Sequence, residues 1–143
     1  MKLKLITKSS EETISVASKL AKTLKKPLVI SLVGDLGAGK TTFTKGFALG
    51  LGIDENITSP TFTILNEYKG ENNLYHFDMY RLSSKEEADE LGFEEYFDLS
   101  KLDGITVVEW AENVKGLLPN LHTEIEIRKV DDETREIIIE IKG

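Results

Sequence analysis

Hydrophobic positions recur along the chain with two different periods, and each period predicts a different kind of element. Between Ile14 and Leu24 they are spaced by three and four residues, which favours a helix with one buried stripe. Residues 28–33 and 104–110 are instead nearly continuous hydrophobic runs rich in β-branched side chains. Such runs are typical of strands buried on both faces of a sheet. We therefore expect strands in a sheet that helices cover on both sides.

Shorter patterns predict more strands. Segments 61–68 and 73–80 flank a polar Lys-Gly-Glu-Asn turn, which indicates a hairpin. Two hydrophobic runs near the end of the chain are separated by Asp131, Asp132 and Glu133. The strands expected from these patterns cover 2–6, 61–68, 73–80, 123–130 and 135–141.

Capping signals add the positions of helices. Ser9 with Glu12, and Ser84 with Glu87, have the spacing of a capping box. A third helix is predicted over 41–52, where Gly52 would end it. Its hydrophobic stripe consists of Phe43, Phe47 and Leu51. Helices that alternate with strands in this way indicate an α/β fold with a mixed sheet.

Length and composition fit one domain covering 1–143, since the chain has 143 residues of which 40% are hydrophobic and 30% charged. No apolar run approaches the roughly 18 residues of a membrane span, and the first residues lack the apolar core of a signal peptide. The chain has no cysteine, so we expect no disulfides and no thiolate metal site. His76 and His122 are too far apart in sequence to suggest zinc. We expect a soluble cytoplasmic protein.

The net charge of −7 argues against a chain that binds nucleic acid unaided, because such binding depends on neutralising phosphates with Lys and Arg. Action on RNA through a partner remains open.

The segment Gly34-Asp-Leu-Gly-Ala-Gly39-Lys40-Thr41 carries the clearest chemical signal. It matches the P-loop pattern, and it lies between a predicted buried strand and a predicted helix. Glycines let successive backbone N–H groups surround a phosphate, and the start of the helix favours an anion. Lys40 would reach the β- and γ-phosphates, and the Thr41 hydroxyl would bind Mg²⁺. The alternative is an ordinary glycine-rich turn from strand to helix.

A magnesium site in a P-loop protein needs a further carboxylate, which often lies at the end of a buried strand. Glu109 and Asp78 both satisfy that description, and the sequence leaves the choice open. Ser59-Pro60-Thr61 follows the predicted P-loop helix, where a hydroxyl could meet the γ-phosphate or the attacking water. An ordinary Ser-Pro turn is the alternative. Trp110, the single tryptophan, is either a core residue or a neighbour of the nucleotide.

Taken together, four motifs closely resemble the TsaE family, the bacterial ATPases of tRNA threonylcarbamoyladenosine modification. The motifs are "GDLGAGKTTFTKGFALGLG", "SPTFTILNEY", "LYHFDMYRL" and "VVEWAE". They occur in family order and extend from about Leu28 to Glu112. The resemblance implies a single P-loop NTPase domain of α/β class, with a mixed, mostly parallel sheet of about seven strands flanked by helices.

The resemblance also implies roles for individual residues. Thr41 and Glu109 would hold Mg²⁺, while Thr61 and Asp78 would lie near the γ-phosphate. ATP would bind the loop and its neighbours, namely Asp35, Leu36, Gly37, Ala38, Gly39, Lys40, Thr41 and Thr42, with Trp110 from the family's "EW" signature. Family members also use an N-terminal segment and a C-terminal basic residue near the base, for which this chain offers Thr7 and Arg135. Ala111 stands where the family usually has proline.

For the wider function, the resemblance implies a partner-dependent ATPase. The family acts with TsaD and TsaB, contacts tRNA only through that assembly, and is thought to reset it between turnovers by an ATP cycle. Arg81 is the nearest candidate for a catalytic arginine within the chain, although a surface ion pair is its more ordinary role. Without such an arginine we expect slow hydrolysis by the isolated chain and faster hydrolysis with partners.

Three rival functions share the P-loop. A small-molecule kinase would need an acceptor site and an arginine-bearing lid, for which the chain has little room. A GTPase would need an Asn-Lys-x-Asp sequence, which is absent. A nucleotide-gated binding module, in which occupancy rather than hydrolysis sets partner affinity, remains open.

Overall fold

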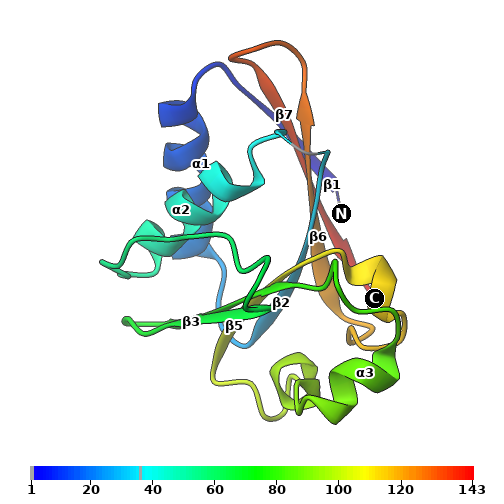
Figure 1. Ribbon diagram of the computed structural model, residues 1–143. Helices are drawn as coiled ribbons and strands as arrows, with labels where there is room; N and C mark the ends of the chain where they lie inside the picture. Colours follow the sequence, from blue (N-terminus) through cyan, green and yellow to red (C-terminus); the bar gives the residue numbers. More distant parts are fainter. Residues whose placement is uncertain (1, 36) are drawn as a thin grey trace.

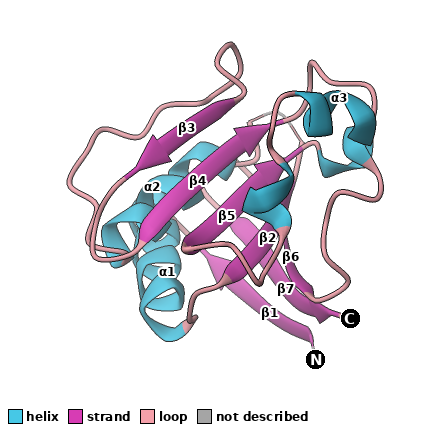
Figure 2. Cartoon of the chain, turned by 90° about the horizontal axis from the view of Figure 1, so that it is seen from below, coloured by secondary structure: helices cyan, strands magenta, loops and turns pink. Residues whose placement is uncertain are grey.

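The computed structural model describes residues 2–35 and 37–143, in which seven strands form one sheet (Figures 1 and 2). The order across the sheet is β1-β7-β6-β2-β5-β4-β3. The strands are β1 (Lys2–Thr7), β2 (Leu28–Val33), β3 (Leu65–Tyr68), β4 (Asn73–Asp78), β5 (Gly104–Glu109), β6 (His122–Lys129) and β7 (Arg135–Lys142). All strands expected from the hydrophobic patterns are therefore present.

Strand direction confirms the expected mixed α/β sheet. The central pairings, β6 with β2, β2 with β5 and β5 with β4, are parallel. The outer pairings, β1 with β7, β7 with β6 and β3 with β4, are antiparallel. Consequently the carboxyl ends of β2, β4 and β5 meet at one edge of the sheet. The start of β7 lies at the same edge, where Arg135 is paired with Thr7 at the end of β1.

Helices cover the two faces of the sheet separately. Two of them, α1 (Ser10–Thr23) and α2 (Lys40–Gly50), share a hydrophobic core with one face. On the other face pack α3 (Lys85–Glu90) and the short 3-10 helices η1 (Glu94–Phe97) and η2 (Ala111–Val114). Figure 1 shows α1 with α2 on one side of the strands and α3 on the other. The sequence patterns did not predict the two 3-10 helices.

The expected capping interactions are confirmed. The Glu12 backbone N–H donates to Ser9 Oγ at 3.1 Å, and the Glu87 N–H donates to Ser84 Oγ at 3.2 Å. The predicted stripe of α2 is buried, with Phe43, Phe47 and Leu51 all at most 2% exposed. The helix ends at Gly50, two residues before the expected Gly52.

Close packing joins α1 and α2. A Cβ built on Gly46 of α2 would lie 2.5 Å from the Ile14 carbonyl oxygen of α1. Only glycine permits so close an approach of the two helices.

Alternation along β4 decides which of its side chains can act chemically. Tyr75 and Phe77 belong to the core under α3, whereas Leu74 belongs to the core under α1 and α2. Because side chains alternate between the faces of a strand, His76 and Asp78 also point to the α1–α2 face. That face continues into the edge where β2 ends.

Some predicted strand ends are wrong. Thr61 lies in a turn rather than a strand, and the turn is closed by the Ile64 N–H donating to the Pro60 carbonyl at 2.7 Å. β4 stops at Asp78 and β5 at Glu109. Trp110 takes a left-handed conformation with φ of 61°, so the chain turns away from the sheet there. None of the helices in the described residues has the length and apolar character needed to cross a membrane.

Candidate functional site

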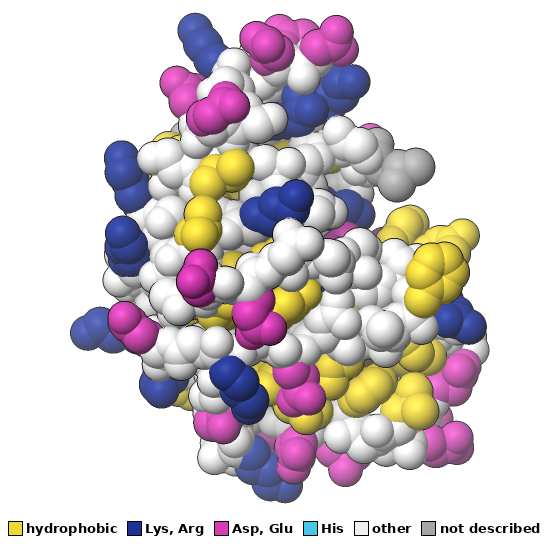
Figure 3. Space-filling model, turned by 60° about the vertical axis from the view of Figure 1, so that its left-hand side comes forward, with side chains coloured by type: hydrophobic (Ala, Val, Ile, Leu, Met, Phe, Trp, Pro, Cys, Tyr) yellow, Lys and Arg dark blue, Asp and Glu magenta, His cyan; other side chains and the backbone are white. Residues whose placement is uncertain are grey.

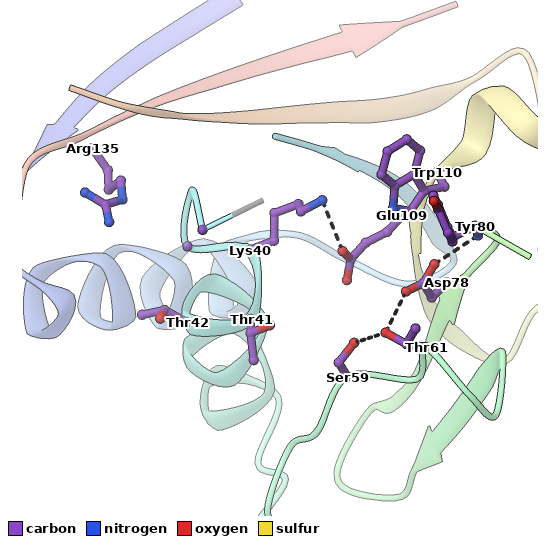
Figure 4. A pocket seen from close by; sticks show the side chains of 12 residues that line it. Lys40, Thr41, Thr42, Ser59, Thr61, Asp78, Tyr80, Glu109, Trp110 and Arg135 are labelled. Atoms are coloured by element: carbon purple, nitrogen blue, oxygen red, sulfur yellow. Dashed lines mark hydrogen bonds and ion pairs between the residues drawn. The ribbon is translucent and has the colours of Figure 1, made fainter. Parts of the chain in front are cut away.

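A cleft of about 640 Å³ opens at the edge where β2, β4 and β5 end. Its size is that of a small-molecule site, and in open α/β sheets ligands bind outside the carboxyl ends of the strands. The cleft is lined by Gly37, Gly39, Lys40, Thr41, Thr42, Ser59, Thr61, Asp78, Tyr80, Glu109, Trp110 and Arg135 (Figure 4). Segments distant in sequence therefore converge on one space.

The glycine loop presents the open start of α2 to this cleft. Gly39 caps the helix in a left-handed conformation with φ of 104°, which glycine adopts without steric cost. Among the described residues no side chain caps the helix, and its first turn holds no acidic residue. The N–H groups of that turn and the positive end of the helix dipole are thus available to an anion.

Arg135, at the start of β7, is bonded to the glycine loop. Its Nε donates to the Ala38 carbonyl at 2.8 Å. Its Nη1 donates to the carbonyls of Asp131, Asp132 and Thr134 at 2.8–3.3 Å. The guanidinium therefore ties the β6–β7 turn to the glycine loop. Figure 4 shows Arg135 at the far end of the cleft from Glu109 and Asp78.

Lys40, Glu109 and His76 form a buried chain of polar contacts. Lys40 Nζ lies 3.4 Å from Glu109 Oε1, with side-chain exposures of 14% and 9%. His76 Nε2 lies 2.8 Å from the other oxygen, Glu109 Oε2. Lys40 Nζ also lies 5.6 Å from the centroid of the Trp110 ring, which is within the range of a cation–π contact. Tyr80 packs edge-on against Trp110 with ring centroids 5.0 Å apart.

These contacts keep Glu109 ionised. Burial by itself would raise the pKa of this carboxyl. The hydrogen bond from His76 and the charges around it, including that of Lys40, outweigh burial and hold the pKa of Glu109 below its ordinary value. The cleft thus contains a paired cation and carboxylate, side by side.

A second polar group closes the other side of the cleft. Thr61 Oγ1 donates to Asp78 Oδ2 at 3.1 Å and lies 2.8 Å from Ser59 Oγ. Asp78 Oδ1 accepts from the Tyr80 backbone N–H at 3.0 Å. Both carboxylate oxygens of Asp78 therefore have donors, and the turn at Thr61 holds its hydroxyl over the end of β4. Figure 4 shows this group facing Thr41 across the cleft.

Most of the predicted site residues line the cleft, and three of the described ones do not. Asp35 lies on an adjoining groove of about 460 Å³ that shares Lys40 and Trp110 with the cleft. Ala38 is 1% exposed, its N–H donates to the Asp35 carbonyl at 2.9 Å, and its carbonyl accepts from Arg135. Leu36 lies outside the described residues. Thr7 is buried and its hydroxyl lies 2.7 Å from that of Thr13, so its predicted contact with a base stays a prediction.

His76 and Tyr80 belong to the site but were not among the predicted residues. Both lie in the "LYHFDMY" segment that was used to predict a strand. His76 stands two positions before Asp78, and alternation on a strand places both on one face. That spacing was the available signal. Tyr80 gives no comparable signal because it follows the end of the strand.

The donor set fits magnesium bound together with phosphates. Within residues 2–35 and 37–143, no three His, Asp or Glu side chains cluster as they would in a protein-only metal site. Mg²⁺ commonly takes one or two carboxylates, keeps several waters and uses phosphate oxygens for the rest. Glu109 and the Thr41 hydroxyl, facing one cleft, are suited to that mode.

Comparison with known proteins identifies the family. Residues 7–137 match the family described as "Threonylcarbamoyl adenosine biosynthesis protein TsaE". The chain belongs to the TsaE family. The Bacillus subtilis TsaE is 46% identical over 142 residues, covering 99% of this chain and 87% of that relative. The Treponema pallidum TsaE is 41% identical over 137 residues, covering 96% of this chain and 99% of the relative.

A solved structure agrees with the family assignment. The crystal structure of Bacillus subtilis YdiB superimposes with a TM-score of 0.84 at 42% sequence identity. The match covers 100% of this chain and 87% of the YdiB chain. The two relatives above both carry the name tRNA threonylcarbamoyladenosine biosynthesis protein TsaE. The resemblance seen in the four motifs is thereby confirmed at the level of the TsaE family.

Proposed function

We propose that this chain is a Mg²⁺-dependent ATPase that supports threonylcarbamoyladenosine formation on tRNA in the cytoplasm. The observation that carries the proposal is the 3.4 Å pair of Lys40 and Glu109 at the open start of α2. A phosphate-binding lysine and a metal-binding carboxylate are the two side chains that phosphoryl transfer needs beside a glycine loop.

The residues divide the work between binding and positioning. The loop N–H groups and Lys40 would bind the β- and γ-phosphates, and Glu109 with Thr41 would hold the metal. Mg²⁺ would supply charge neutralisation of the phosphate oxygens. Asp78 and Thr61, already joined by a hydrogen bond, would orient the attacking water. Trp110 and Arg135 would lie against the nucleotide at the two ends of the cleft.

The arginines support a partner-dependent reaction. The chain has three, Arg81, Arg128 and Arg135. Within the described residues, Arg81 does not form the surface ion pair expected for it, but donates to the Phe62 carbonyl at 3.2 Å. Arg128 is paired with Glu126 at 2.9 Å, and Arg135 is bonded to backbone carbonyls. Among the described arginines only Arg135 lines the cleft, and its Nε and Nη1 already donate to backbone carbonyls. We therefore expect a partner to supply the missing cation.

Charge supports an indirect contact with tRNA. The net charge is −7, and acidic and basic side chains are intermingled on the face shown in Figure 3. A protein that neutralises many phosphates by itself carries a basic surface instead. We propose that TsaD and TsaB are the partners through which the chain acts on tRNA.

The test is Mg-ATP hydrolysis by the purified chain, alone and with TsaB and TsaD, using Lys40→Ala as the control. We expect slow hydrolysis alone, at least tenfold stimulation by the partners, and loss of both in the variant. Binding of ATP without hydrolysis in either condition would instead support the nucleotide-gated binding module. Phosphorylation of a small acceptor would support a kinase.

A further inference from the structure

His76 is a buried histidine that the proposed reaction does not use. Its side chain is 0% exposed and lies on β4, on the face of the sheet that α1 and α2 cover. Unlike an ordinary core side chain, it makes a polar contact, because its Nε2 is 2.8 Å from a carboxylate oxygen of Glu109. Burying an imidazole in a hydrophobic core is unfavourable unless it makes such a bond.

The direction of this hydrogen bond follows from the chemistry of its two partners. An ionised carboxylate only accepts hydrogen bonds, so His76 Nε2 carries the proton and donates it. Within the part of the chain that the structure describes, Nδ1 has no partner. His76 thus acts as a fixed hydrogen-bond donor to Glu109.

The two partners of Glu109 differ in whether they can keep their contact with it when phosphates bind. Lys40 is at the cleft surface, and its proposed role is to bind phosphates, which requires it to leave Glu109. His76 has no access to the cleft and belongs to the strand adjoining that of Glu109, where Asp78 is the direct neighbour of Glu109. It can therefore keep hold of Oε2 when Oε1 is released.

We propose that His76 is the positioning residue that orients Glu109 toward the metal once nucleotide has drawn Lys40 away. This inference rests on the proposed function, because it assumes that Glu109 binds Mg²⁺ beside a nucleotide. Hydrogen-bond partners of metal ligands commonly change metal affinity or activity by 10- to 100-fold when they are removed. Removing His76 should therefore reduce the part of the nucleotide affinity that depends on Mg²⁺. It should not change the part that the glycine loop supplies without metal.

The measurement is how much Mg²⁺ tightens the binding of a non-hydrolysable ATP analogue. The dissociation constant is obtained from the fluorescence of Trp110, the single tryptophan, first with EDTA and then with Mg²⁺. His76→Asn and His76→Gln form a matched pair. The glutamine amide reaches the position of Nε2 and keeps the donor, whereas the asparagine amide is too short to do so.

For His76→Asn we expect a fall of about tenfold or more in the Mg²⁺ effect, with the affinity in EDTA unchanged. His76→Gln should recover most of the Mg²⁺ effect. Thr106→Val is the control for lost stability alone: Thr106 is buried on β5 and donates to the Tyr96 carbonyl at 2.7 Å, away from the cleft. It should lower the melting temperature and leave the Mg²⁺ effect intact.

Equal Mg²⁺ effects in His76→Asn, His76→Gln and the unchanged chain would overturn the inference. The same holds if Thr106→Val reduces the Mg²⁺ effect as much as His76→Asn does, since the loss would then report general destabilisation. Should His76→Asn not fold, His76→Phe replaces it with a side chain that fills the space but cannot donate. If instead the proposed function is wrong, the unchanged chain would bind no ATP analogue, either with EDTA or with Mg²⁺.

Discussion

At the scale of single residues, the site consists of groups that hold one another before any ligand arrives. Glu109 is shared between Lys40 and His76, and Asp78 is shared between Thr61 and a backbone N–H. Preorganised groups of this kind need little rearrangement at the moment of reaction. Lys40 is the exception, because its contact with Glu109 must change when phosphates bind.

The hydroxyl of Thr61 provides a test of the water-orienting role. Thr61→Val keeps the shape of the side chain but removes the donor to Asp78. We expect the turnover number to fall by about 100-fold, while the affinity for the non-hydrolysable analogue changes by less than about threefold. Steady-state kinetics and a fluorescence titration measure the two quantities.

Thr63→Val is the matched control, because Thr63 lies in the same turn but donates to Asn66 at 2.8 Å, outside the cleft lining. Equal turnover in Thr61→Val and the unchanged chain would remove Thr61 from the reaction.

At the scale of elements, the connection between β4 and β5 is fastened by an ionisable pair on the face opposite the cleft. The Tyr75 hydroxyl on β4 donates to Asp103, which directly precedes β5. This hydrogen bond lowers the pKa of Asp103. A carboxyl whose pKa is lowered in the folded state stabilises the fold above its unfolded pKa of about 3.9 and loses that contribution as the pH falls through the folded value.

Tyr75→Phe should therefore lower stability most at neutral pH. We expect a loss of about 1 kcal/mol in the free energy of unfolding near pH 6, since Asp103 is largely exposed and screened by solvent. Below about pH 4 the difference from the unchanged chain should shrink, because Asp103 becomes protonated in both. Urea unfolding between pH 6 and pH 3 measures it.

Tyr68→Phe serves for comparison, since the Tyr68 hydroxyl donates to the Thr58 carbonyl at 3.4 Å and involves no carboxylate. Its loss of stability should not vary with pH in this range. A Tyr75→Phe deficit that is equally constant would contradict the assignment to Asp103.

The same scale shows what the sequence could predict. Hydrophobic period and capping pairs located all strands and the main helices, because those signals are local. The ends of β4 and β5 were set too late, since the reversals after Asp78 and Glu109 depend on packing around the cleft. His76 was overlooked as a site residue because its partner lies 33 positions away on a neighbouring strand. Only the pairing of β4 with β5 brings them together.

At the scale of the whole molecule, the cleft joins segments that run from Gly37 to Arg135. A ligand that contacts the glycine loop, the end of β5 and the start of β7 stabilises the folded chain as a whole, because these segments separate on unfolding. Ligand affinity is then visible in global stability.

Mg-ATP should therefore raise the melting temperature. At a free concentration of about 100 times the dissociation constant the gain is about 2.7 kcal/mol, which corresponds to roughly 5–10 °C for a domain of this size. Differential scanning fluorimetry measures the shift, and Lys40→Ala should abolish most of it. The absence of any shift at saturating Mg-ATP would count against the cleft as an ATP site.

The strand order also has a consequence for how the protein is made. In the sheet formed by residues 2–35 and 37–143, β2, which leads into the glycine loop, pairs only with β5 and β6, and β1 pairs only with β7. On a ribosome, the first two strands therefore emerge long before the strands that hold them. α1 and α2 can pack together early, because both precede residue 51. The phosphate-binding site, however, is complete only after the end of β5 has been made. The bond from Arg135 to the glycine loop forms only after β7 has begun. A nascent chain therefore cannot use nucleotide until these strands have been synthesised.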